Sequence, residues 1–455
     1  MNIDPELVLT ICNYIFYGLI GIVALKAIFG LIRGFWKSLC ALIVSIACYV
    51  LIIVFNGAIA EYLFNMDLSG VAQGASITLN ETVVEISTLG EFVKDVIIIL
   101  TKDVYDFTNN PELLEMVGVL TLTFISYVSF IVLILVTIFI VAPILSFIIY
   151  NLIFKLIIGK DFMDEHKLRL AGFFTNALKA FISTVLFITP FSAITNSVSK
   201  AIEPYDMSLN ETNAQLKELV DAYDNSLLAK TFNIVTINDS SFDVAIVDNA
   251  TSFKLAEDSY TSFVSELAMI LDIAASAISE EVINLQDGSI DTANLLNKTF
   301  ISNTISTLAE NPLVTKLIPV VLSIVANMES IKNVVDISFV DWNGIDWSSE
   351  LSTLDDIYGQ FYDLNMMDLL VNGDDINSYI INRQDQYGFE GIFKDIGSSQ
   401  VLKTVLPYVI SSFASNIEGE FAGILPTEVS YYEQVDLGNE LSAIYDSVLA
   451  LSDLA

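Results

Sequence analysis

Histidine is almost absent from this chain of 455 residues, which contains only His166. That residue lies beside Lys167 and Arg169, between two long apolar runs and outside the acidic second half of the chain. Histidine triads and HExxH zinc sites need histidines at defined positions within one site. Such sites are therefore excluded from the second half, and no Walker loop or dinucleotide-binding fingerprint occurs. We expect no cofactor, no metal site and no enzymatic activity.

Cysteine is also scarce. The three cysteines, Cys12, Cys40 and Cys48, all fall within the first two apolar runs. The long remainder of the chain has none, so a disulfide framework is excluded there.

Basic residues are few compared with acidic ones: 20 Lys and Arg stand against 55 Asp and Glu, for a net charge of −35. Residues 200–455 hold 40 of the acidic and 10 of the basic side chains, and so carry 30 of the 35 net negative charges. A surface of this charge repels nucleic acid and anionic lipid headgroups. We therefore expect no nucleic-acid partner and a strongly solvated exterior, with bulk cation binding as the alternative.

Charged residues are missing from four long stretches. They are residues 7–29, 38–60, 116–154 and 170–195, interrupted only by Lys26 and Lys179. About 20 apolar residues in a helix cross the hydrocarbon core of a bilayer, which is about 30 Å thick. The pattern predicts four transmembrane helices within residues 1–200. The third stretch is too long for one crossing, so Pro143 is expected to divide it into a span at 117–141 and a tilted or interfacial helix at 144–158.

The basic residues of the first 200 positions predict the orientation of these helices. Arg33 and Lys37 lie in the short turn after the first span, and residues 160–169 form a second basic-biased turn before the last. Basic loops face the cytoplasm, so both termini are expected outside. The first six residues contain no positive charge and do not resemble the start of a signal peptide. Lys179 lies about ten residues into the last stretch, where it either snorkels or pairs as a structural residue, or faces the bundle in a transport role.

Two motifs give the first 200 residues a resemblance to a known family. The first is Gly-x-x-Arg-Gly-Phe-x-Lys, and the second is the segment 169–181; their residues of interest are Gly30, Arg33, Gly34, Phe35 and Lys37, and Arg169, Gly172 and Lys179. Together with the apolar runs, they resemble the colicin V production (CvpA) family of small four-span membrane proteins. In the second segment this chain has Asn176, Lys179 and Ala180 where a glycine-rich pattern ending in Arg-Gly is usual in that family.

The resemblance implies a multi-pass protein of the bacterial inner membrane, linked to toxin production or export and to envelope maintenance, without an established catalytic activity. Some relatives carry an additional domain outside the membrane, in certain cases a serine protease. A histidine-dependent protease is excluded here, because the predicted exterior contains no histidine.

Beyond residue 200, the sequence contains a recurring pattern. A lysine within a short apolar segment recurs at Lys230, Lys316 and Lys403, at intervals of 86 and 87 residues. A second element follows each time, centred on Leu255, Trp347 and Leu437. These recurrences predict three tandem helical units, at 201–288, 289–378 and 379–455, with chance similarity as the alternative. The alternating segments 232–238 and 242–247 indicate short strands in the first unit.

We therefore expect an all-α membrane protein with four transmembrane helices and an acidic, mainly helical extracytoplasmic domain over 201–455. The favoured function is a non-enzymatic scaffold that contacts the lipid bilayer and envelope or secretion proteins, with homo-oligomerisation left open. A component of a transport or export channel is the alternative. A carboxylate-based enzyme outside the membrane is a third hypothesis, for which the sequence gives no pocket.

Overall fold

The computed structural model describes most of the chain. The described residues are 4–69, 76–79, 82–85, 87–101, 111–159, 168–208, 211–256, 259–285, 288–291, 294–327, 332, 337–338, 340–363, 388–416 and 425–452. They are overwhelmingly helical, and their strands form three antiparallel pairs of two strands each. The prediction of an all-α protein is confirmed at this level. The chain divides into two compact units, Met1–Ser279 with Asn284–Ser289, and Glu280–Ile283 with Ile290–Ala455.

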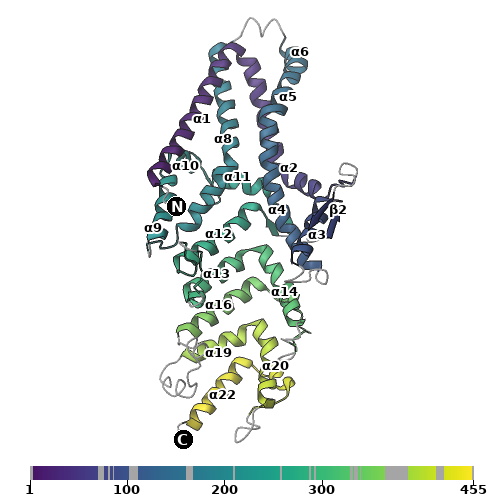
Figure 1. Ribbon diagram of the computed structural model, residues 1–455, viewed down its shortest axis with the longest axis vertical. Coiled ribbons are helices and arrows are strands. Elements are labelled where there is room, and N and C mark those ends of the chain that lie inside the picture. The colour runs from purple at the N-terminus through teal and green to yellow at the C-terminus, as the bar shows by residue number, and fades with distance from the viewer. Residues whose placement is uncertain are drawn as a thin grey trace. The chain divides into compact units, whose positions relative to one another are not determined.

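Long apolar helices dominate the first unit (Figure 1). They are α1 (Pro5–Arg33), α2 (Phe35–Asn65), a run from α4 (Pro111–Val136) to α6 (Lys155–Ile158), and α8 (Arg169–Ile202). In the described part of the chain these four are long and apolar enough to cross a membrane, and a fifth arises only if α13 and α14, bent by 103°, form one span. The four predicted apolar helices are confirmed, and the chain is a membrane protein.

The surface of α1 exposes many large apolar side chains. Along its length, large apolar side chains remain exposed on several sides, including Tyr14, Leu25 and Ile32, the last at 77%. Exposed apolar surface of this extent is unfavourable in water and favourable in hydrocarbon. Local signals fix the ends of α1: the Asp4 carboxylate accepts a hydrogen bond from the Glu6 N–H at 2.9 Å, and the helix ends at Gly34, whose φ is 79°.

The third long run differs from the prediction, because it continues through Pro143 without a break. A π-helical turn, η2 (Thr137–Val141), lies before the proline, α5 (Ala142–Ile149) contains it, and a second π-helical turn, η3 (Tyr150–Phe154), leads to α6. Proline removes one helical hydrogen bond and crowds the preceding turn. A wider turn directly before it accommodates that defect, so the helix continues through Pro143 instead of dividing there.

Shorter elements complete the first unit. They are β1 (Ser76–Leu79), β2 (Thr82–Glu85), the amphipathic α3 (Leu89–Thr101), α9 (Glu211–Asp224), α10 (Leu227–Phe232), β3 (Thr236–Ile237), β4 (Ser240–Ser241), α11 (Phe242–Thr251), β5 (Phe253–Ala256), β6 (Ser259–Thr261) and α12 (Phe263–Ser279). Both α11 and α12 pack against the long helices, where Val247 and Val264 join a core that contains Tyr49, Phe130 and Ile134.

A buried asparagine links this layer to the long helices. The Asn56 side chain in α2 is fully buried and donates hydrogen bonds to the carbonyl oxygens of Ser126 in α4 at 2.9 Å and Ala250 in α11 at 2.8 Å. Ser129 in turn donates to the Asn56 Oδ1 at 2.7 Å. A buried polar group with its bonds satisfied favours one register of packing over others. Residues 211–279 therefore belong to the same compact unit as the apolar helices.

Two predictions for the first repeat are wrong. The segment 242–247, predicted as a strand, lies in the helix α11; a short apolar run fits either period, and burial of Ala245 and Val247 against the long helices favours the helix. The second element, centred on Leu255, is the strand β5 instead of a helix start. The helix that follows begins at Phe263, and its first residues, Phe-Val-Ser-Glu-Leu, correspond to Trp-Ser-Ser-Glu-Leu at the start of α16.

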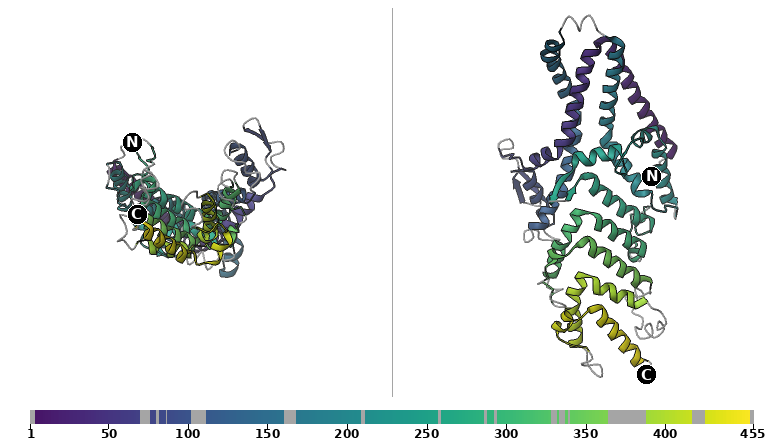
Figure 2. Two further views of the ribbon diagram at one scale, coloured as in Figure 1. Left: turned by 90° about the horizontal axis from the view of Figure 1, so that it is seen from below. Right: turned by 180° about the vertical axis from the view of Figure 1, so that it is seen from behind.

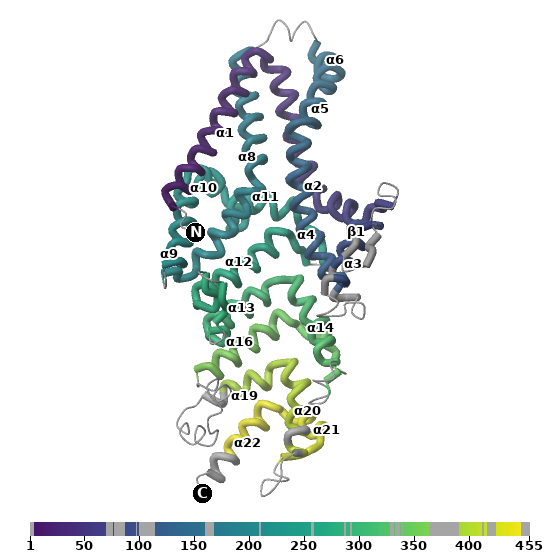
Figure 3. Tube along the Cα trace, in the orientation of Figure 1, coloured from purple at the N-terminus to yellow at the C-terminus, as the bar shows by residue number. Residues whose placement is uncertain are grey.

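The second unit is a succession of helices. In chain order they are α13 (Lys298–Glu310), α14 (Pro312–Asn327), α16 (Trp347–Asp363), α19 (Gly388–Ser398), α20 (Gln400–Asn416), α21 (Val429–Gln434) and α22 (Leu437–Ser452), with short 3-10 turns η4 (Asn294–Leu296) and η5 (Trp342–Gly344). Helix α13 contacts α16, α16 contacts α19, and α19 contacts α22. The order is visible along the green-to-yellow trace in Figures 2 and 3.

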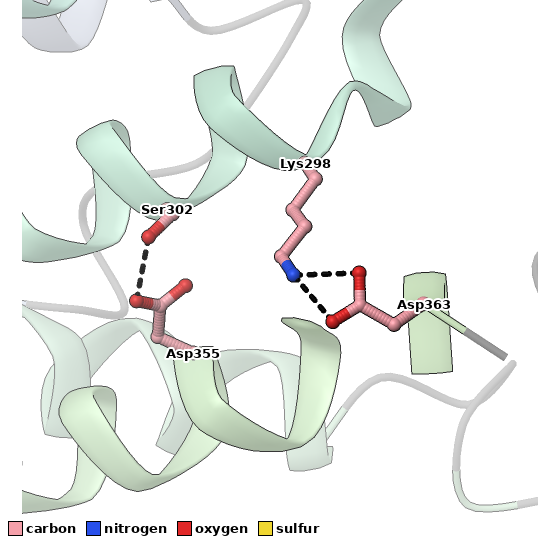
Figure 4. A network of polar contacts seen from close by, with 4 residues as sticks. All are labelled: Lys298, Ser302, Asp355 and Asp363. Atoms are coloured by element: carbon pink, nitrogen blue, oxygen red, sulfur yellow. Dashed lines mark hydrogen bonds and ion pairs between the residues drawn. The ribbon is translucent and has the colours of Figure 1, made fainter. Parts of the chain in front are cut away.

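Two apolar clusters and a few polar contacts hold this succession together. Trp342 and Trp347 are buried with Val401 and Val405 of α20, while Ile357 of α16 lies in a second cluster with residues of α19, α21 and α22. At the α13–α16 contact, Lys298 pairs with Asp363 at 2.6 Å, and the Ser302 hydroxyl donates to Asp355 at 2.8 Å (Figure 4). The ion pair is exposed, so its contribution to stability is about 0–1 kcal/mol.

Candidate functional site

The two sequence motifs meet in the structure, although they lie on different helices. A Cβ atom added at Gly172 of α8 would lie 2.6 Å from the Gly30 carbonyl oxygen of α1 and 2.7 Å from the Gly34 carbonyl carbon. A Cβ added at Gly30 would collide with the Gly172 carbonyl in the same way. Only two residues without side chains allow the backbones to approach so closely. Gly30 and Gly172 therefore form the contact between α1 and α8.

One turn beyond Gly172, a side chain reinforces this contact. The Asn176 amide, which is buried, donates a hydrogen bond to the Lys26 carbonyl oxygen on α1. A side-chain bond to a backbone carbonyl within an apolar layer orients one helix against the other. The sequence singled out Asn176 only as a difference from the family pattern, and nothing in its position predicted a bond to a residue in another helix.

The turn between α1 and α2 is a single residue, Gly34, and it lies at one end of the long helices (Figure 3). Arg33 is the last residue of α1, and Lys37 lies in the first turn of α2. Phe35 is partly buried, and its ring lies edge-on to that of Trp36 with centroids 5.1 Å apart. Gly34 has a positive φ of 79°, a conformation that a residue with a side chain rarely adopts.

A cleft with a volume of about 670 Å³ opens between these helices. We call it the basic cleft, because five cationic side chains line it: Lys26, Arg33, Lys37, Lys155 and Lys179. They come from α1, α2, α6 and α8. Among the described residues that line the basic cleft there is no Asp or Glu. Its remaining wall is largely apolar and includes Leu19, Ile22, Phe139, Phe147 and Phe187.

Tyr150 organises two of the cations. The Lys37 Nζ lies 5.6 Å from the centroid of the Tyr150 ring, and the Lys155 Nζ lies 5.5 Å from it. Lys155 also donates a hydrogen bond to the Asn151 Oδ1 at 2.6 Å. The π-helical turn η3 supplies Tyr150 and Asn151. Cation–π contacts of this length hold ammonium groups in place without neutralising their charge.

Lys179 is the cation farthest from the helix end. It lies ten residues after Arg169, the first residue of α8, which corresponds to about 15 Å along the helix. Its ammonium group is partly buried in a cleft that it shares with Lys26 and Arg33. Like charges repel each other, and partial removal from water increases that cost. The cleft is consequently suited to an anion.

Arg169 itself lies outside the cleft lining, exposed at the start of α8. Thus Arg33, Lys37 and Lys179 of the predicted residues line the cleft, Gly30 and Gly172 form its helix contact, and Gly34 makes the turn. The cations Lys26 and Lys155 also line the cleft and belong to neither motif segment. The contribution of Tyr150 and Asn151 depends on the π-helical turn η3, which no residue type marks in the sequence. The predicted basic turn at 160–167, with His166, lies outside the described residues.

Outside the long helices, burial changes the titration of several groups. Asp224, in α9, accepts a hydrogen bond from Ser199 at 2.5 Å, yet burial raises the pKa of its carboxyl above the ordinary value. Tyr205 donates to Asp272 at 3.1 Å, and burial raises the pKa of the Tyr205 phenol to about 12. Among the described residues, no three His, Cys, Asp or Glu side chains gather in a way that could hold a metal ion.

Comparison of the chain with models of protein families, with curated proteins and with solved structures gave no match. The resemblance to the CvpA family therefore stays a prediction from the two motifs.

Proposed function

We propose that this chain is a non-enzymatic, CvpA-like protein of the bacterial inner membrane, in which four long helices anchor a helical extracytoplasmic scaffold. The scaffold would bind envelope or secretion proteins, in keeping with the toxin-export and envelope roles that the family resemblance implies. Both termini would then lie outside the cytoplasm.

The distribution of charge along the long helices supports this orientation. Helix α1 begins beside Asp4 and Glu6 and ends at Arg33, whereas α2 begins near Lys37 and has Glu61 close to its end. The third run likewise begins near acidic residues and ends at Lys155, and α8 begins at Arg169. The α1–α2 turn, the end of the third run and the start of α8 thus carry basic residues at the helix ends that the positive-inside rule assigns to the cytoplasm, whereas Lys200, in the last turn of α8, is a basic residue at the opposite end.

The observation that carries the scaffold proposal is a buried carboxylate that links two helices of the second unit, α16 and α20. Glu350 of α16 is only 4% exposed and accepts hydrogen bonds from the backbone N–H groups of Gln400 and Val401, at 2.8 and 3.1 Å, and from the Ser399 hydroxyl. These are the first residues of α20, so one helix caps the start of another. A succession of helices that cap and pack on their neighbours presents a long solvent-facing surface, as repeat scaffolds do.

Site-specific photo-cross-linking in intact cells tests the scaffold proposal. A photoreactive residue is introduced at Ser349, exposed on α16, and, as a matched control, at Ile32, exposed on α1. We expect discrete protein adducts at position 349, identified by mass spectrometry as envelope or secretion proteins, and adducts with lipid at position 32. Adducts with only lipid or with cytoplasmic proteins at position 349 would contradict the proposal.

The basic cleft favours a second candidate function, a component that moves anions across the membrane. Lys179 lies deep in α8, and the two π-helical turns that help to line the cleft are a type of irregularity often found at functional sites. Anion flux into vesicles containing the purified chain should then disappear in Lys179→Ala and persist in Lys200→Ala, at the other end of the same helix. Flux that is unchanged in Lys179→Ala would exclude this function.

A further inference from the structure

We infer that the basic cleft binds the phosphate-bearing headgroup of an anionic membrane lipid. The inference goes beyond the proposed scaffold function and does not depend on it, because it concerns only the long helices of the first unit.

The lining of the basic cleft is positively charged. Five cationic side chains and no described carboxylate line the cleft. A phosphate group accepts several bonds from ammonium and guanidinium groups and carries the opposite charge. Binding would reduce the repulsion between Lys179, Lys26 and Arg33, which no acid in the described lining relieves.

The rest of the cleft lining is largely apolar. Phe139, Phe147 and Phe187 come from the third run and α8, and Leu19 and Ile22 from α1. Phe139 and Phe147 are also exposed at 68% and 72%, on helices long and apolar enough to span a membrane. A small soluble anion would make no favourable contact with these apolar side chains, whereas the acyl chains of a lipid would pack against them. The ligand is therefore expected to be amphiphilic.

The depth of the lysines and the volume of the cleft also fit a lipid headgroup. Lys26 lies seven residues before the end of α1 and Lys179 ten residues after the start of α8, so their backbones are about 10 and 15 Å inside the helix ends. Lysine side chains at such depths extend toward the headgroup level. The volume of about 670 Å³ lies within the range of roughly 300–1,000 Å³ found for small-molecule sites, enough for a headgroup and the first part of its chains.

The ring of Tyr150 keeps two of the cleft's cations available to a ligand. Tyr150 holds the ammonium groups of Lys37 and Lys155 on its ring at 5.6 and 5.5 Å. A cation–π contact is weaker than a bond between an ammonium group and a phosphate, so both lysines can transfer to the ligand.

Native mass spectrometry of the full-length protein in neutral detergent tests the inference. The probes are phosphatidylglycerol, phosphatidylcholine, which has the same phosphate but no net charge, and inorganic phosphate. We expect retention of one phosphatidylglycerol in preference to phosphatidylcholine, and no displacement by millimolar inorganic phosphate. Equal retention of the two lipids would overturn the inference, and displacement by inorganic phosphate would assign the cleft to a soluble anion instead.

Variants locate the binding within the cleft. In Lys179→Met, which keeps an unbranched apolar side chain, the affinity for phosphatidylglycerol should fall about fivefold, corresponding to one basic residue near a lipid headgroup. Lys179→Arg retains the charge and should retain the lipid, which separates loss of charge from misfolding. Lys200→Met removes an exposed lysine at the other end of α8 and should leave retention unchanged. Equal effects of Lys179→Met and Lys200→Met would refute the assignment.

Discussion

The buried carboxylate of Glu350 gives the sharpest prediction about the second unit. In Glu350→Ala, three donors at the start of α20 lose the carboxylate that accepts their hydrogen bonds. They are the backbone N–H groups of Gln400 and Val401 and the Ser399 hydroxyl. These two backbone donors are only part-buried, so the loss of each bond costs about 1 kcal/mol, and loss of the charge at the helix start adds about 0.3–1 kcal/mol. Ser399 still caps α20 by accepting from the Leu402 N–H at 3.0 Å, so the helix would not lose every cap. We therefore expect a local destabilisation of about 2–3 kcal/mol.

Hydrogen exchange measured by mass spectrometry on the full-length protein reads this change locally. Because about 1.4 kcal/mol corresponds to a factor of ten, amides of α20 should exchange about 30-fold faster or more in Glu350→Ala. Peptides from α2, in the first unit, should be unchanged. Glu350→Gln keeps an acceptor oxygen and should produce a smaller effect. Glu310→Ala, at an exposed glutamate that ends α13, is the matched control. Equal acceleration of α20 in Glu350→Ala and Glu310→Ala would refute the reasoning.

Three further predictions concern the first unit. Gly30→Ala should lower the melting temperature in detergent, because the added Cβ would meet the Gly172 backbone and overpacking costs about 1–3 kcal/mol. The control Gly18→Ala has open space around the added Cβ and should be neutral or stabilising. A lower melting temperature for Gly18→Ala than for Gly30→Ala would contradict the α1–α8 contact. Asn56→Ala should speed hydrogen exchange in α11 by breaking its bond to the Ala250 carbonyl, and unchanged exchange there would argue against that link. Because burial raises the pKa of the Asp224 carboxyl, folding favours its protonated form, so this group's contribution to stability is greatest below the ordinary pKa of 3.8 and falls as pH rises through the folded-state value. Asp224→Asn should therefore gain in melting temperature relative to the parent at pH 7 but not at pH 3.5, and a gain that is the same at both pH values would refute this cause.

The sequence was most informative where one physical property decides the structure. Uncharged stretches of more than 20 residues predicted the four long helices, and the helices extend only a few residues beyond the predicted spans at most ends. Prediction failed at Pro143, because a π-helical turn is a local compensation that no residue type marks. It failed again at 242–247, where tertiary burial of Val247 decided between two periodicities that the short segment fits equally.

The candidate site was predictable in part for the same reason. Basic residues at apolar-run ends can be read from the chain, so Arg33 and Lys37 were identified together with Lys179. The contact of Gly30 with Gly172 could not be derived, since it joins helices far apart in the sequence and depends on how closely their backbones approach. The apolar wall of the cleft was equally hidden, because Phe139, Phe147 and Phe187 look in the sequence like any other membrane-facing residues.

A measurement of the orientation of α8 in the membrane tests the scaffold proposal most directly, because that proposal requires the start of α8 to face the cytoplasm. Single cysteines are introduced at Leu168 and Ser208, both exposed and just beyond the two ends of α8, in a chain whose three native cysteines are replaced. Intact cells are treated with a membrane-impermeant thiol reagent, and lysed cells serve as the control for reactivity. The account predicts labelling at position 208 and protection at position 168 until lysis. Labelling at 168 with protection at 208 would contradict it, because the basic ends of the helices would then face outward and the second unit would lie in the cytoplasm.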